Sequence, residues 1–299
     1  MKKSVSLLLA ALMLTGALAG CGSSASASDT QAADGADTGV SGAITVISRE
    51  DGSGTRGAFV ELTGVEEKNA DGQKVDNTTA DAEIANKTDV VLTSVAGNEK
   101  AIGYISLGAL NDTVKAVKVD GAEATVDNVK NGSYKLSRPF NIATKGEPTG
   151  VAKDFINFIL SKDGQAVVTD NKYIAVNDAA EAFVSDGSSG KIAVGGSSSV
   201  SPVMEKLIEA YKNVNPNAAI DLQTSDSTSG MTGAMDGTFD IGMASRELKD
   251  EEAAQLTGTV IALDGIAVVI NPANTIDGLS MDQIKSIYVG DITDWSDLA

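Results

Sequence analysis

The sequence contains no histidine and a single cysteine in 299 residues. Without histidine there is no Ser-His-Asp triad and no histidine-ligated metal site. One cysteine excludes an internal disulfide and a cysteine-based metal cluster. The sequence also lacks a Walker A motif and the G-x-S-x-G spacing of a nucleophile turn. A secreted phosphatase or hydrolase is therefore disfavoured, and we expect no enzyme activity, no metal and no cofactor.

Positive charge is also scarce, because 23 lysines and arginines face 41 aspartates and glutamates, a formal net charge of −18. A protein that binds nucleic acid usually carries a basic face, so we expect no nucleic-acid partner. Net charge governs solubility and long-range steering rather than the chemistry of one site. A local anion site built from close donors therefore remains compatible with this acidic chain.

The N-terminal residues have the pattern of a bacterial secretory signal. Two lysines precede an apolar run from Ser6 to Leu18, which is too short to span a bilayer comfortably. The run ends in Leu-Ala-Gly-Cys21, which resembles a lipobox. We expect a signal peptide at 1–20, lipidation of Cys21, and a flexible tether over 21–42, rich in serine, alanine and glycine. The alternative is an ordinary signal with a buried cysteine.

The segment Ser48–Phe59 reads Ser-Arg-Glu-Asp-Gly-Ser-Gly-Thr-Arg-Gly-Ala-Phe and lies between a strand pattern and a helix pattern. Ser53 and Thr55 supply hydroxyl donors, and Gly54 lets the backbone approach a ligand closely. The first N–H groups of a helix are unpaired and attract anions. The segment therefore predicts an anion site, and the alternative is an Asp-Gly turn followed by a capped helix.

The charged residues of this segment have distinct expected roles. Arg49 supplies a planar, permanently charged fork suited to an oxyanion. We expect Asp51 to pair with Arg49 and hold it in one pose. Arg56 lies beyond the loop and is expected to face solvent.

The same arrangement of strand, Ser/Thr/Gly loop and helix occurs twice more. Gly195–Pro202 follows the short strand pattern at Ile192–Val194, and Ser225–Gly230 follows the one at Ile220–Leu222. Each loop alone is a weak signal. Together they indicate helix N-termini that converge on one anion.

These segments resemble the phosphate-binding proteins of bacterial ABC transporters, receptors that close two lobes over one phosphate ion. Ser48–Phe59 is similar to their arginine-and-glycine signature, Gly196–Met204 to their first phosphate loop, and Ser227–Gly230 to their second. Further similar segments are Ala101–Ser106, Asp240–Leu248, Leu263–Ile270 and Gly290–Trp295.

The order of the segments differs from the usual family order, in which the part from Lys191 onward comes first and Ser48–Phe59 follows Trp295. The chain is therefore similar to a circularly permuted member, with Ser185–Gly190 as the new join. In such a chain Asp297–Ala299 should lie beside Gly42–Ile44.

The resemblance implies an α/β, two-lobed periplasmic-binding-protein-like fold of type II, with phosphate in the cleft between the lobes. The alternation of strands and helices also predicts α/β layers. One lobe, 43–105 plus 268–299, would carry the arginine-and-glycine signature. The second lobe, 107–266, would carry the two serine-rich loops.

The resemblance also implies the ligand contacts, with Gly54 and Ser199 acting mainly through backbone N–H groups. Ser245 stands where family members place an aspartate that accepts a hydrogen bond from the phosphate proton. Asp264 and Asp226 are candidate replacement acceptors, or else turn and cap residues. Arg246 either adds positive charge near the ligand or forms a surface or interlobe salt bridge. The expected phosphate-binding residues are Arg49, Ser53, Gly54, Thr55, Ser198, Ser199, Ser227 and Ser245.

The expected function is high-affinity extracytoplasmic binding of inorganic phosphate and its delivery to ABC transporter permease subunits. We expect a monomer that is lipid-anchored to the outer face of the bacterial cytoplasmic membrane and touches the membrane through the anchor only. The alternatives are a surface lipoprotein that uses the same fold for a sulfate-like oxyanion, or for adhesion.

Overall fold

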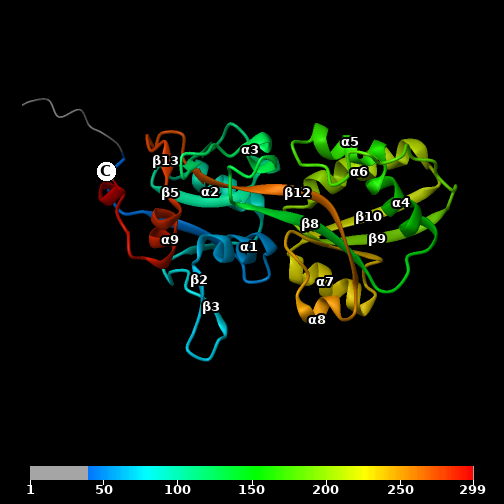
Figure 1. Ribbon diagram of the computed structural model, residues 1–299, viewed down its shortest axis with the longest axis horizontal. Coiled ribbons are helices and arrows are strands. Elements are labelled where there is room, and N and C mark those ends of the chain that lie inside the picture. The colour runs from blue at the N-terminus through cyan, green and yellow to red at the C-terminus, as the bar shows by residue number, and fades with distance from the viewer. Residues whose placement is uncertain (1–39, 299) are drawn as a thin grey trace, which may run out of the picture. The chain divides into compact units, whose positions relative to one another are not determined.

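The structure is a computed structural model and describes residues 40–298. The expected signal peptide and the expected lipidation site at Cys21 lie outside the described residues, as does most of the expected tether. From residue 40 to 298, strands and helices alternate along the chain (Figure 1). Within this part of the chain, no helix combines the length and the apolar character needed to cross a membrane.

The first lobe is built around parallel strands, with β1 paired to β4 on one side and to β5 on the other. Strand β5, Ala-Ile-Gly-Tyr-Ile-Ser, is buried throughout, as expected for a central strand of a sheet that is covered on both faces. Its elements are β1 (Thr45–Arg49), α1 (Gly54–Thr63), β2 (Glu66–Lys68), β3 (Lys74–Asp76), β4 (Glu83–Ala85), α2 (Thr88–Ala96), β5 (Ala101–Ser106), η1 (Leu107–Ala109), β6 (Lys115–Ala116), β7 (Lys118–Val119), α3 (Val126–Lys130), β13 (Gly278–Leu279), α9 (Met281–Val289) and η2 (Trp295–Leu298).

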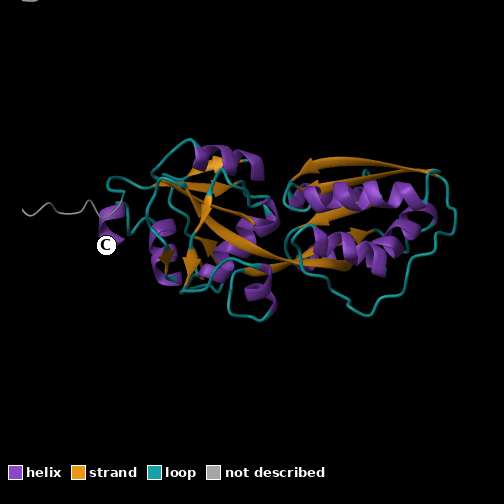
Figure 2. Cartoon of the chain, turned by 90° about the horizontal axis from the view of Figure 1, so that it is seen from above, coloured by secondary structure: helices purple, strands orange, loops and turns teal. Residues whose placement is uncertain are grey.

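The second lobe places β9 between β10 and β11, all three parallel. Helix α6 buries Val203, Met204, Leu207, Ile208 and Tyr211, a stripe at helical spacing that packs on this sheet. Helices pack against the strands in both lobes (Figure 2). The elements of this lobe are α4 (Gly150–Leu160), α5 (Lys162–Asp170), β9 (Gly190–Ser197), α6 (Ser201–Val214), β10 (Ala218–Ser225), α7 (Ser227–Asp236), β11 (Ile241–Ala244) and α8 (Asp250–Ala253).

Two antiparallel strands, β8 (Ser137–Thr144) and β12 (Thr257–Ile270), connect the lobes (Figure 1). The first part of β12 pairs with β8, and its last residues, from Ile266 onward, pair with β5 of the first lobe. A nine-stranded sheet therefore runs through both lobes in the order β10-β9-β11-β8-β12-β5-β1-β4, with β6 beside β12.

The hydrophobic cores correct one boundary of the expected lobes. Residues 107–136 were expected in the second lobe, but Leu107, Val117 and Leu136 belong to the core of the first lobe. The reason is pairing with β12, because the Val117 N–H donates to the Val268 carbonyl at 3.0 Å and the Tyr134 hydroxyl donates to the Ile266 carbonyl at 2.8 Å. The chain therefore passes into the second lobe at β8.

The two ends of the described chain lie side by side in the first lobe. The Ile44 N–H donates to the Thr293 carbonyl at 2.8 Å, and the Trp295 N–H donates to the Gly42 carbonyl at 3.2 Å. The Gly42 N–H reaches Asp294 Oδ1 at 3.0 Å, and the indole of Trp295 is buried beneath this contact. The ends of the described chain thus lie close together as expected, and the contacts are made by Thr293–Trp295, a few residues before the expected Asp297–Ala299.

The expected join at Ser185–Gly190 has little regular structure before β9 begins, but one buried carboxylate ties it down. Asp154 on α4 accepts hydrogen bonds from the Ser185 hydroxyl at 2.7 Å and from the Asp186 N–H at 3.0 Å. The hydroxyl of Tyr211 on α6 donates to the same carboxylate at 2.7 Å. The join is therefore anchored to two helices of the second lobe.

Candidate functional site

Buried serine and threonine hydroxyls from both lobes meet where the lobes touch. We call this group the hydroxyl cluster. All its members are buried, although most lie at the ends of strands or the starts of helices. The hydroxyl cluster consists of Thr55, Thr88, Ser197, Ser198, Ser199, Ser227 and Ser245.

In the first lobe, the start of α1 faces the cluster. The Ser53 hydroxyl accepts the Arg56 N–H at 3.3 Å and so caps this helix. Gly54 follows as the first helical residue, and a Cβ atom there would lie 2.4 Å from Ser227 Oγ and 2.9 Å from Ser245 Oγ. The helix N-terminus can approach the second lobe this closely only because position 54 has no side chain.

In the second lobe, three parallel strands bring their carboxyl ends to one edge, where ligands of such sheets bind. Ser197 ends β9, Ser227 follows β10 and begins α7, and Ser245 follows β11. The Ser199 N–H, expected to face the ligand, bonds Ser197 Oγ at 3.3 Å.

Hydrogen bonds between hydroxyls join the lobes directly. Thr55 Oγ1 lies 2.8 Å from Ser199 Oγ and 3.3 Å from Ser245 Oγ. Thr88 Oγ1 lies 3.4 Å from Ser198 Oγ and 3.3 Å from Ser199 Oγ. The predicted hydroxyl residues Thr55, Ser198, Ser199, Ser227 and Ser245 are thus brought together.

Arg49 enters the cluster from β1 and is 2% exposed. Its Nη2 donates to Ser198 Oγ at 3.1 Å. Its counter-ion is Glu50, which accepts from Nε and Nη2 at 2.8 Å each. The expected pairing with Asp51 is wrong, because Asp51 lies in a turn with its side chain 97% exposed and pairs with Arg56 at 2.8 Å.

The environment of Arg56 also differs from the expectation that it faces solvent. Its side chain is 15% exposed and pairs with Asp51 and Asp76 at 2.8 Å each. Its Nη1 also donates to the Arg49 carbonyl at 2.8 Å. Arg56 therefore holds the backbone of the loop in place through the Arg49 carbonyl.

Tyr104 on β5 supports the same loop from below. Its hydroxyl oxygen accepts the Arg49 N–H at 3.1 Å and lies 2.9 Å from Ser48 Oγ, and its ring stacks on Phe59 with centroids 4.0 Å apart. Burial raises the pKa of Tyr104 to about 12, so the phenol keeps its proton at neutral pH. The Tyr104 hydroxyl therefore fixes both the Arg49 backbone and the Ser48 side chain at the start of this loop.

A second buried arginine, Arg138 on β8, reaches the cluster and is not among the predicted residues. Its Nη2 donates to Thr55 Oγ1 at 3.0 Å, and its Nη1 pairs with Asp264 Oδ2 at 2.7 Å. Burial raises the pKa of Asp264, and the adjacent Arg138 opposes that shift. Asp264 is therefore occupied as a counter-ion.

Three hydroxyls of the cluster accept hydrogen bonds from N–H groups of the protein. Ser198 accepts from Arg49, Thr55 accepts from Arg138, and Ser227 accepts the Ser245 N–H at 3.1 Å. A hydroxyl that accepts from a fixed N–H group keeps its own proton for another acceptor. Such converging donors can bind an oxyanion.

The remaining candidates have structural partners. Arg246 forms a bidentate pair with Glu252 of α8 at 2.7 and 2.8 Å, so its salt bridge lies within the second lobe. Burial alone would raise the pKa of Glu252, but its hydrogen bonds with Arg246 and the Lys249 N–H lower it. Asp226 caps α7 by accepting the Ser229 N–H at 2.9 Å. Within residues 40–298, no group of acidic or cysteine side chains could hold a metal ion.

The sequence analysis missed two cluster members, Ser197 and Thr88, and two charged residues beside the cluster, Glu50 and Arg138. Ser197 lies inside the predicted loop Gly195–Pro202 and is the last residue of β9, and Thr88 begins α2 soon after β4. Thr88 therefore repeats the pattern of a strand, a polar loop and a helix, which could have identified it. Glu50 and Arg138 carry no comparable local signal.

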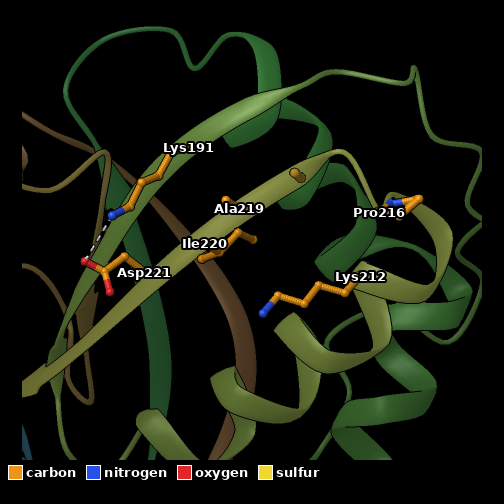
Figure 3. Close-up of a pocket in the computed structure, with 7 residues that line it drawn as sticks. Lys191, Lys212, Pro216, Ala219, Ile220 and Asp221 are labelled. Atoms are coloured by element: carbon orange, nitrogen blue, oxygen red, sulfur yellow. Dashed lines mark ion pairs between the residues drawn. The ribbon is translucent and has the colours of Figure 1, made fainter.

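A surface hollow of about 530 Å³ is lined by residues of β9, α6 and β10 in the second lobe (Figure 3). It is lined by Lys191 and Lys212, among others, and Lys191 faces Asp221 at 3.9 Å. Lys191 is the second residue of β9, which ends at Ser197, so the hollow and the cluster are at opposite ends of this strand. The hollow is therefore separate from the site.

Comparisons with known proteins agree with this architecture. A family model described as a PBP superfamily domain matches residues 24–163 and 181–299. A Phosphate-binding protein PstS 2 from Streptococcus agalactiae serotype V is 52% identical over 300 residues, which cover 99% of this chain and 98% of that protein. A Phosphate-binding protein PstS from Bacillus subtilis (strain 168) is 37% identical over 139 residues, which are 45% of this chain and 42% of that protein.

A solved structure extends the likeness to three dimensions. The crystal structure of a phosphate-binding protein of a phosphate ABC transporter from Streptococcus pneumoniae TIGR4 shares 50% sequence identity. The match covers 86% of this chain and 100% of that chain, with a TM-score of 0.69. The expected α/β, two-lobed periplasmic-binding-protein-like fold is therefore confirmed.

Proposed function

Because this chain belongs to the family of phosphate-binding proteins of phosphate ABC transporters, we propose that it binds inorganic phosphate outside the cytoplasm with high affinity. It then delivers the ion to the permease subunits of such a transporter, without catalysing a reaction. The observation that carries this proposal is the hydroxyl cluster, in which buried donors from both lobes converge beside Arg49.

The proposed ligand set is Arg49, Ser53, Gly54, Thr55, Ser198, Ser199, Ser227 and Ser245. A hydrogen bond to a charged group contributes about 1.5–3 kcal/mol net, and each helix N-terminus adds about 0.3–1 kcal/mol. Several such contacts can exceed the roughly 8 kcal/mol of micromolar binding, with the remainder offset by the cost of ordering both lobes.

Entry of the ion requires the lobes to part. Thr55 and Ser199 hydrogen-bond each other across the interface at 2.8 Å, a separation that leaves no space for a phosphate between them. On binding, these hydroxyl–hydroxyl bonds are replaced by bonds to the oxyanion. We infer that β8 and β12, the strands shared by both lobes, carry the motion.

Selectivity among oxyanions depends on Ser245, which supplies a hydroxyl where a carboxylate is expected in the family. Asp226 and Asp264, the candidate replacements, are engaged with Ser229 and Arg138. We therefore propose that this site excludes sulfate less strictly than a site with an aspartate does, which keeps a sulfate-like oxyanion as the second candidate ligand.

The remaining proposals concern the cell surface and the chain order. We propose that Cys21 is lipidated after removal of 1–20, and that a monomer is held at the outer face of the membrane by this anchor alone. We also propose that the chain is circularly permuted. Pairing of Gly42–Ile44 with Thr293–Trp295 supports this, because these segments are neighbours along the chain in the usual family order.

The experiment that tests the function is calorimetry of the purified protein with phosphate and with sulfate. We expect Arg49→Ala to weaken phosphate binding about 10- to 100-fold or more, since it deletes a charged donor of the cluster. Lys212→Ala, which removes an exposed charge at the distant hollow, should leave affinity unchanged. Absence of phosphate binding by the unaltered protein would refute the proposal, and equal phosphate and sulfate affinities would favour the broader ligand class.

A further inference from the structure

Arg138 lies where the chain passes from the first lobe into the second, and it is 4% exposed. Each of its side-chain nitrogens has a buried acceptor. Nε donates to the Ser245 carbonyl at 3.0 Å, and Nη1 donates to Asp264 Oδ2 at 2.7 Å and to the Gly265 carbonyl at 3.1 Å. Nη2 donates to Thr55 Oγ1 at 3.0 Å. The guanidinium is therefore fixed by the second lobe and β12. Of these contacts, the one to Thr55 connects it to the first lobe.

The bond to Thr55 connects Arg138 to the centre of the cluster. Thr55 Oγ1 lies 2.8 Å from Ser199 Oγ and 3.3 Å from Ser245 Oγ. Since Thr55 accepts from the guanidinium, its own proton is available to a further acceptor, which in a ligand complex is the oxyanion. A hydroxyl that accepts from a cation is also a stronger donor, because hydrogen bonds in a chain polarise one another.

We propose that Arg138 is a positioning residue of the oxyanion site, which orients and polarises the Thr55 hydroxyl toward the bound ion, with Asp264 holding the guanidinium in place. This inference rests on the proposed function. It gives the site a second cation in addition to Arg49, one that acts through a hydroxyl of the first lobe only when the lobes are together.

Asp264 fits the role of counter-ion better than that of a ligand. One of its oxygens accepts from Arg138 at 2.7 Å and the other accepts the Gly108 N–H at 3.3 Å. Both partners are donors that the protein itself supplies, so the carboxylate is occupied on both sides. Its charge is matched by Arg138, so the pair brings a donor to the cluster without adding net negative charge beside the anion.

The test is a double-substitution cycle on phosphate affinity, measured by calorimetry with Arg138→Met, Thr55→Val and the two combined. Each single change should weaken binding about 10- to 100-fold, the range set by one charge-assisted hydrogen bond. The combined variant should bind no more weakly than the weaker single variant, because residues that act through one contact are not additive. Additive losses would overturn the proposal.

Two controls separate this role from a purely structural one. Thr63→Val alters another buried threonine of α1, whose hydroxyl donates to the Phe59 carbonyl at 2.7 Å away from the cluster, and it should leave phosphate affinity unchanged. Arg138→Met with Asp264→Asn removes the ion pair together, so that no buried carboxylate is left unpaired. The melting temperature of this double variant should be closer to that of the unaltered protein than the melting temperature of Arg138→Met is. Its affinity for phosphate should be as low as that of Arg138→Met.

The outcomes distinguish the two proposals. If the Arg138→Met/Asp264→Asn variant binds phosphate as tightly as the unaltered protein, the role of Arg138 is refuted while phosphate binding stands. If the unaltered protein binds neither phosphate nor sulfate, the proposed function fails, and the role of Arg138 fails with it.

Discussion

Gly54 lies where the first lobe closely approaches buried hydroxyls of the second lobe. A Cβ atom at this position would lie 2.4 Å from Ser227 Oγ, far inside van der Waals contact, and the serine is itself buried. We predict that Gly54→Ala holds the lobes apart and weakens phosphate binding strongly, while the first lobe keeps its fold. Calorimetry gives the affinity, and thermal melting verifies that the variant is folded.

Gly57 offers a matched control on the same helix. A Cβ atom there would have its nearest neighbour, Arg246 Cδ, at 3.9 Å, which is ordinary contact. Gly57→Ala should therefore bind phosphate normally and gain up to about 1 kcal/mol of stability from helix propensity. Similar affinities for Gly54→Ala and Gly57→Ala would contradict the close-approach argument.

Site residues that the sequence identified belong to local patterns, whereas Arg138, which it missed, makes contacts with residues far away in the chain. Thr55 and Ser198 stand in local patterns of strand, loop and helix, so their place at a helix N-terminus is visible in the sequence. Arg138 bonds Thr55 across 83 positions and is otherwise an ordinary strand residue before a proline. The choice between Glu50 and Asp51 as partner of Arg49 depends on which carboxylate the turn directs outward, which composition does not encode.

Among the elements, α4 holds the expected join of the permuted chain through a single carboxylate. Asp154 is 2% exposed and accepts hydrogen bonds from Ser185, Asp186, Tyr211 and Asn215. Burial alone would raise the pKa of Asp154, but these hydrogen bonds outweigh it and lower the pKa below its ordinary value. A group with a depressed folded-state pKa stabilises the fold above its unfolded pKa, and this contribution is lost as the pH falls through the folded-state value.

We predict that Asp154→Asn destabilises the protein at pH 7 by on the order of 2 kcal/mol, since an amide cannot accept from all of these donors. The difference from the unaltered protein should shrink as the pH drops below about 4, the ordinary aspartate range. Urea unfolding across this pH range measures it, with Asp170→Asn at the exposed end of α5 as the control. A difference that persists unchanged in acid would show that the charge of Asp154 is not responsible.

Long, periodic elements were predictable, whereas short ones were not. The apolar spacing over Val151–Leu160 predicts a helix, and α4 spans Gly150–Leu160. The strands β6 and β7 have two residues each and too little pattern to reveal which lobe they join. Their place is set by pairing with β12 and β13, segments far away in the chain, which explains why 107–136 was expected in the wrong lobe.

For the whole molecule, the proposed permutation makes a direct prediction about chain connectivity. A relinked chain would begin at Lys191, continue from residue 298 into residue 43, and end at Val184. We expect this relinked chain to fold and to bind phosphate with nearly unchanged affinity. The new link joins segments that already hydrogen-bond each other, and the opened join is an irregular surface segment.

Circular dichroism, thermal melting and calorimetry of the relinked chain would be compared with those of residues 40–298 in their natural order. A relinked chain that stays unfolded while the natural order folds would argue against the permutation. It would show that the present connectivity carries interactions that the fold requires.

The division of the first lobe into two chain segments has a consequence for how the protein is made. Its core needs Ile266–Ile270 and α9, which are synthesised after residues 137–265, and these residues already contain the second lobe. When the chain emerges N-terminus first, β1, β4 and β5 appear before their partners in β12 and α9, so the second lobe can complete its core before the first lobe does. The order of the segments along the chain therefore sets the order of folding: the first lobe begins first, but it completes its core after the second lobe.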